Sequence, residues 1–124
     1  MKSAEMPVWT VEFAAAAEQD FELIFDHLLQ TYQDFGDDLD VAFDRARQRI
    51  LSIQASARDL VRVPFQGTLR PDILDGLRFV RNNKAVFWFV LNEERKIVQV
   101  LAVFFGGQDH IQHMLMRMLS EMPE

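Results

Sequence analysis

The residues of this chain that could carry out chemistry gather in its C-terminal half. Gln108, Asp109, His110 and His113 lie close together, and the two histidines are three residues apart. Histidines at this spacing can share a metal ion, but no further ligand motif accompanies them. We interpret Asp109 as the N-cap of a C-terminal helix and the histidines as partly exposed helix residues. We therefore expect no metal and no other cofactor.

Cationic side chains form a second group, at Arg78, Arg81 and Lys84. Arg78 follows the long loop 58–76, so it can either hold that loop or contact a binding target, and the sequence favours neither. Arg81 and Lys84 flank a predicted turn. Charged side chains at such positions are mostly solvated, and we expect the same here.

A sheet must position both groups. Aromatic and β-branched runs at 77–81, 84–91 and 96–105 are split by short polar segments, which predicts a three-stranded antiparallel meander. Val86–Leu91 is apolar on both faces, as in an inner strand that is covered on both sides. Either another part of the chain or a partner must cover the second face.

The turn between the first two strands sets which side chains face each other. We expect a two-residue turn at Asn82–Asn83, because asparagine tolerates positive φ. This turn would pair Arg81 with Lys84 and Phe79 with Val86. The alternation of strands then places two sets of residues on opposite faces, the first comprising Arg78, Val80, Ala85 and Phe87, and the second Phe79, Arg81, Lys84, Val86 and Trp88.

Helical spacing precedes the meander. One apolar stripe predicts a helix from about Ala14 to Gly36, and a second predicts a helix from Leu39 to Ala57. The stripes consist of Phe21, Ile24, Phe25, Leu28, Leu29 and Tyr32, and of Leu39, Ala42, Phe43, Ala46, Ile50 and Ile53. With a strand at Val8–Phe13 and a helix over 111–119, the chain is a single α+β domain spanning residues 1–124.

Composition excludes several classes of protein. The 124 residues include no cysteine, so there is no disulfide and no thiol nucleophile. The N-terminus lacks the apolar segment of a signal peptide, and no apolar run reaches membrane-spanning length. The net charge of −6 argues against nonspecific nucleic-acid binding. We expect a cytoplasmic protein that binds neither membrane nor nucleic acid directly.

Three segments resemble the ParE/RelE toxin superfamily of bacterial type II toxin–antitoxin systems. They are the loop Pro64–Gly67, the entry to the meander at Asp75–Arg78 and its exit at Phe104–Asp109. The entry and the exit resemble ParE-like members in particular. The resemblance implies a RelE/ParE-like two-layer domain, with an N-terminal strand, an antiparallel helix hairpin, a three-stranded antiparallel meander and a short C-terminal helix.

RelE-like toxins are ribosome-dependent mRNA endoribonucleases, which hold the scissile phosphate with cations. By resemblance, their basic residues match Arg78, Val80, Ala85 and Gly107, and only Arg78 is basic here. The tyrosine that assists catalysis in some of them falls near His113. We therefore expect no catalytic residues and no enzyme.

ParE-like toxins are understood to inhibit DNA gyrase by binding, and a ParD-like antitoxin neutralises them. The resemblance makes gyrase the possible target and such an antitoxin the partner, although ParE often has a histidine and an arginine where Phe105 and Gly107 stand. We assign target binding to Arg78, Arg81, Phe105, Gln108 and Asp109, and antitoxin docking to Met114, Met118 and Met122. A RelE-like ribonuclease and a degenerate, non-toxic interaction module of the same fold are the alternatives.

Overall fold

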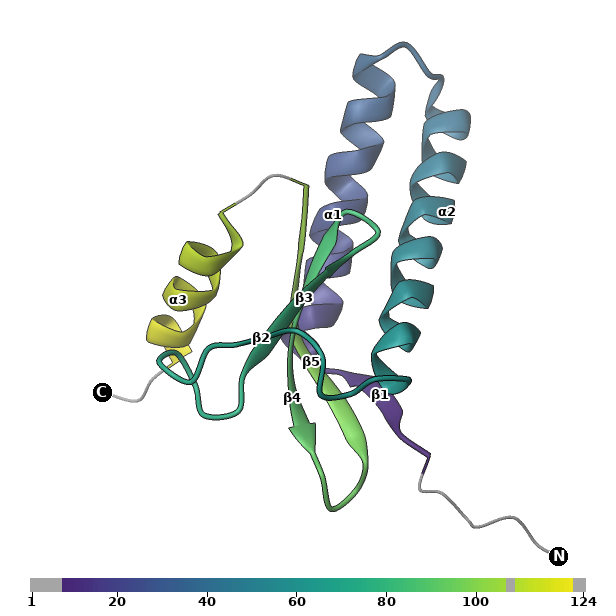
Figure 1. The fold of residues 1–124 in the computed structure, drawn as a ribbon. Helices are drawn as coiled ribbons and strands as arrows, with labels where there is room; N and C mark the ends of the chain where they lie inside the picture. The colour runs from purple at the N-terminus through teal and green to yellow at the C-terminus, as the bar shows by residue number, and fades with distance from the viewer. Residues whose placement is uncertain (1–7, 107–108, 122–124) are drawn as a thin grey trace, which may run out of the picture.

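The computed structural model describes residues 8–106 and 109–121 (Figure 1). A five-stranded sheet with the order β1-β5-β4-β3-β2 forms its centre. A helix hairpin, α1 and α2, packs on one face, and α3 lies on the other. The elements are β1 (Thr10–Phe13), α1 (Ala15–Asp34), α2 (Leu39–Ala57), the short 3₁₀ helix η1 (Arg58–Val61), β2 (Thr68–Leu69), β3 (Arg78–Asn82), β4 (Ala85–Asn92), β5 (Ile97–Phe105) and α3 (His110–Glu121).

Strand β4 is buried on both faces, as its sequence predicts. Phe87 and Phe89 belong to the core beneath the helix hairpin, whereas Val86 and Trp88 belong to a second core together with Met114 of α3. The chain itself therefore covers the second face of the sheet, and α3 adds a small layer to the two that were expected. The α+β class and the predicted order of elements are confirmed.

The turn between β3 and β4 lies one residue later than predicted, so the predicted register of the two strands is wrong by two residues. Asn83 and Lys84 have φ values of 57° and 63° and form the turn, so Asn82 pairs with Ala85 and Arg81 with Val86. The predicted faces survive, because opposite residues keep the same alternation. A contact from α2 explains the position of the turn: the Arg49 guanidinium donates to the Asn83 side-chain oxygen (2.7 Å) and to its carbonyl oxygen (2.9 Å).

The loop before the meander is more ordered than its sequence suggests. Residues 58–61 form η1, and β2 pairs with β3 through Thr68 opposite Phe79. Gly67 precedes β2 at φ +91°, and a side chain there would lie 2.5 Å from the Phe79 carbonyl oxygen. Only glycine fits this approach without displacing the strand.

The helix hairpin follows the predicted stripes near the sheet and departs from them toward its far end. Phe21, Ile24 and Leu28 are buried, and α2 has the predicted bounds. Leu39 and Phe43 belong to the predicted core stripe but are 58% and 50% exposed. The reason is geometric, because the hairpin extends well beyond the sheet (Figure 1), so the sheet does not cover its far end.

Candidate functional site

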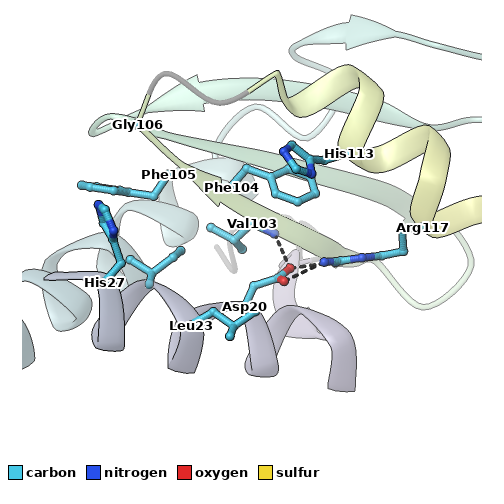
Figure 2. Close-up of a pocket in the computed structure, with 10 residues that line it drawn as sticks. Asp20, Leu23, His27, Val103, Phe104, Phe105, Gly106, His113 and Arg117 are labelled. Carbon is cyan, nitrogen blue, oxygen red and sulfur yellow. Dashed lines mark hydrogen bonds and ion pairs between the residues drawn. The ribbon is translucent and has the colours of Figure 1, made fainter. Parts of the chain in front are cut away.

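The longest unpaired strand edge of the sheet lies at the end of β5. Strand β1 pairs in parallel with Ile97–Val100 only, so the second half of β5 has no neighbouring strand on that side within the described residues. A groove of about 610 Å³ runs along this edge between α1 and α3 (Figure 2). We call it the edge groove; its lining is Asp20, Leu23, Ile24, His27, Val103, Phe104, Phe105, Gly106, His113 and Arg117.

A buried ion pair closes one end of the edge groove. The Asp20 carboxylate is 4% exposed and accepts two hydrogen bonds from the Arg117 guanidinium, both 2.8 Å long. It also accepts the Val103 backbone N–H at 2.9 Å, in place of the strand that β5 lacks there. Figure 2 shows the two side chains meeting across the strand edge. Helices from opposite faces of the sheet are thus joined through β5, and the bidentate pair compensates the burial of the carboxylate.

Two histidines line the same groove. The His113 ring stacks on Phe104 at a centroid distance of 5.7 Å, and His27 reaches the groove from α1, beside Phe105 (Figure 2). Imidazoles suit proton transfer near neutral pH. However, Arg117 is the one cation among the described lining residues, and it is bound to Asp20. The lining of the edge groove therefore suits an extended or apolar segment better than a phosphodiester, which needs cations that are free to bind it.

The assigned target-binding residues do not form one site. Arg78 donates to the Phe65 carbonyl oxygen at 2.8 Å and lies over the Phe65 ring, so it fastens the preceding loop to β3. Arg81 lies on the other face and donates a long bond, 3.4 Å, to the Gly106 carbonyl oxygen at the end of β5. Phe105 is half-buried beneath the guanidinium of Arg49. Arg81 and Phe105 therefore flank the edge groove, whereas Arg78 does not.

The start of α3 agrees with its predicted cap. The Asp109 side chain accepts the Gln112 N–H at 3.2 Å, as an N-cap residue does. Gln108 lies outside the described residues. No group of three His, Asp or Glu residues that could hold a metal occurs in the part of the chain that the structure describes.

His110 is a partly exposed helix residue, as expected, but its ring also contacts two aromatic side chains of the sheet. Its ring packs edge-on against Phe79 at 4.8 Å and lies 5.5 Å from Trp88. Burial lowers the pKa of His110, and the nearby positive charge of Arg81 lowers it further. The lowered pKa favours the neutral imidazole, and the partly buried ring packs beside Phe79 and Trp88. His113, by contrast, is exposed as predicted.

The methionines of α3 face in different directions. Met114 is fully buried in the second core and Met118 packs partly against it, so the expected docking role does not fit Met114 in this conformation. The apolar stripe of the helix turns inward because it must cover Trp88 and Val86. Met122 lies outside the described residues. Among the methionines in the described part of α3, Met116 is the exposed one, at 62%.

Sequence reasoning missed Asp20, Arg117 and His27. Asp20 directly precedes the core residue Phe21, so a carboxylate next to the buried stripe of α1 was a signal for a buried ion pair. Its partner is 97 residues away along the chain, and neither spacing nor periodicity could identify it.

No protein-family model and no curated protein sequence matches the chain. Solved structures do share its fold. The chromosomal ParDE TA system from P. aeruginosa matches with a TM-score of 0.61 and 18% identity, over 82% of this chain and 99% of that chain. The RelBE2 toxin–antitoxin complex from Mycobacterium tuberculosis matches with a TM-score of 0.57 and 19% identity, over 84% of this chain and 98% of that one.

These similarities cover most of this chain and nearly the whole of each matched chain. No helix within the described ranges is long and apolar enough to cross a membrane. The order of strands and helices, the hairpin and the terminal helix correspond to one known architecture. The chain has the RelE/ParE toxin fold.

Proposed function

We propose that this chain is the toxin of a type II toxin–antitoxin module, that it acts by binding its target rather than by cleaving RNA, and that a ParD-like antitoxin neutralises it. The target that we propose is DNA gyrase. The fold, shared with a ParDE system and a RelBE2 complex, supports the toxin assignment. Choosing between the two activities depends on the side chains of this chain.

One observation favours binding. Of the positions that match the phosphate-holding residues of RelE, Val80 and Ala85 are apolar and pack into the core beneath the hairpin. Arg78 is engaged with the carbonyl of Phe65. Losing one transition-state contact of this kind costs about 10²–10³ in rate. A chain that lacks several has no means of stabilising the cleavage transition state at these positions.

The test measures target inhibition directly. Purified chain is titrated into a gyrase supercoiling reaction, and the same chain is expressed in a sensitive bacterium. We expect loss of supercoiling, and slow growth with filamentation and DNA-damage signalling. Normal growth together with full supercoiling, at confirmed levels of folded protein, would refute the proposal.

A matched pair of charge-reversal variants tests whether the end of β5 contacts the target. Arg81 is exposed beside the end of β5, and its hydrogen bond to the Gly106 carbonyl oxygen is long, so Arg81→Glu should preserve the fold and weaken inhibition. Arg95 is equally exposed but lies in the turn at the opposite end of the sheet. Arg95→Glu changes the net charge by the same amount and should leave inhibition unchanged.

A second candidate function is a ribonuclease of the RelE kind, and the observation that favours it is the placement of His27 and His113 in one groove. Ribosome-programmed mRNA tests it. Site-specific cleavage that His27→Ala or His113→Ala abolishes would establish this activity in place of the first.

A further inference from the structure

A second groove lies between the two helices of the hairpin. It has a volume of about 530 Å³, and we call it the helix groove. Its floor is apolar and consists of Phe13, Phe21, Phe25 and Ile50. Phe25 and Ile50 belong to the core stripes of their helices but remain half-exposed. The open groove thus leaves part of each apolar stripe exposed to solvent. Exposed apolar surface of this kind marks binding sites.

One wall of the helix groove carries a regular row of carboxylates. Glu18, Glu22 and Asp26 line it at intervals of four residues on α1. At a rise of about 1.5 Å per residue, neighbouring carboxylates are roughly 6 Å apart along the helix axis. All three are exposed, and none has a hydrogen-bond or ion-pair partner within the described residues. Glu18 also suits the first turn of its helix, but Glu22 and Asp26 have no such local role.

We propose that the helix groove binds a basic amphipathic helix of a protein partner, with apolar side chains on the aromatic floor and lysines or arginines along the acidic wall. A third helix fills the space between two packed helices, and it presents side chains at i and i+4 with the same spacing as the carboxylates. Opposite charges at matched spacing then fix its register. The inference rests on the proposed function in one respect, since the partner of a toxin is its antitoxin.

The proposed partner chemistry is unusual for this fold. A toxin usually supplies basic residues for an acidic antitoxin tail, whereas this chain has a net charge of −6. Like charges across an interface would repel, so an acidic segment along Glu22 and Asp26 is disfavoured. The partner segment that fits here is cationic.

The test uses two synthetic helical peptides with one shared leucine stripe, each of roughly 18 residues because shorter helices are marginal in water. One carries lysines at three positions four residues apart, and the other carries glutamates there. Fluorescence anisotropy measures their binding to the purified chain. We expect the lysine peptide to bind at least about tenfold more tightly, equal to about 1.4 kcal/mol. The preference should shrink as salt screens the charges.

Paired variants distinguish the effect of the groove carboxylates on binding from the effect of the overall negative charge of the chain. The triple variant Glu18→Gln, Glu22→Gln, Asp26→Asn should lose the tenfold preference. The control variant Asp34→Asn, Asp38→Asn, Asp40→Asn removes the same number of exposed charges at the hairpin tip and should keep it. The inference would be overturned if the two peptides bound equally tightly, or if both triple variants lost the preference for the lysine peptide to the same extent.

The apolar floor has its own control. Ile50→Ala should weaken the lysine peptide, whereas Leu51→Ala, on the exposed outer side of the same helix, should not. Circular dichroism confirms that each variant is folded. The growth assay is scored separately: absence of growth arrest contradicts the proposed toxin function, and selective peptide binding still supports the groove.

Discussion

Removing either partner of the Asp20–Arg117 pair should destabilise the fold strongly and unequally. The Asp20 side chain is 5% exposed and that of Arg117 is 22% exposed. Breaking a buried pair by deleting one partner costs about 3–5 kcal/mol, because the other charge is stranded. In Arg117→Ala the largely buried carboxylate loses its charged partner and two hydrogen bonds, so we expect the upper end of that range.

Asp20→Asn should cost less, about 3 kcal/mol. Its amide oxygen can still accept the Val103 N–H, and the partly exposed guanidinium of Arg117 can turn toward solvent. The double variant Asp20→Leu, Arg117→Leu removes both charges. It should be less destabilised than the sum of the single leucine variants by about 2 kcal/mol, within the range found for residues in contact.

Urea denaturation followed by tryptophan fluorescence measures these differences, since Trp88 lies in the core that α3 covers. The exposed pair Arg47–Asp44 is the matched control, and Asp44→Ala should change stability by less than about 1 kcal/mol. Single variants of the buried pair that unfold like the wild type, or strictly additive double variants, would refute the claim that this pair holds α3 to the sheet edge.

Four further outcomes follow from the geometry. Phe21→Ala should cost about 3–5 kcal/mol in urea denaturation, and Phe25→Ala clearly less because its ring is half-exposed in the helix groove. Burial lowers the pKa of His110 in the folded state, so the unfolded chain binds more protons below about pH 6.5 and stability falls as the pH decreases; His110→Gln should flatten this dependence in denaturation curves recorded across that range. Ribosome-programmed mRNA should stay intact with the purified chain, as primer extension would show. The reading frame that neighbours this gene should encode a small protein with a basic, amphipathic helical segment, and an acidic segment that binds this chain would contradict that expectation.

Local patterns predicted most of the fold. The 3.6-residue period placed α2 at its observed bounds, and the two-sided apolar run identified β4 as the inner strand. The turn at Asn83–Lys84 was missed by one residue, since either pair of residues can adopt positive φ and the choice depends on Arg49 of α2. Periodicity within one element carries no information about such a distant contact.

The candidate site was predicted less well than the fold, for a related reason. Arg78 looked equally able to bind a target or to hold a loop; the structure shows its hydrogen bond to the Phe65 carbonyl oxygen of the loop, and its contact with a target stays a prediction. Met114 looked like docking surface because an amphipathic helix does not reveal which face its neighbours cover. Both outcomes depend on elements that are far apart in sequence.

Helix α1 is the element that connects these features. Its inner face supplies Phe21, Ile24 and Leu28 to the core, and one flank supplies Leu23 and His27 to the edge groove. The opposite flank carries the carboxylate row of the helix groove. Since both grooves share this helix, a segment bound in one lies about one helix diameter, roughly 10 Å, from a segment bound in the other. A single partner segment that crosses α1 is therefore long enough to fill both grooves if its basic helix lies in the helix groove and an extended portion lies beside β5.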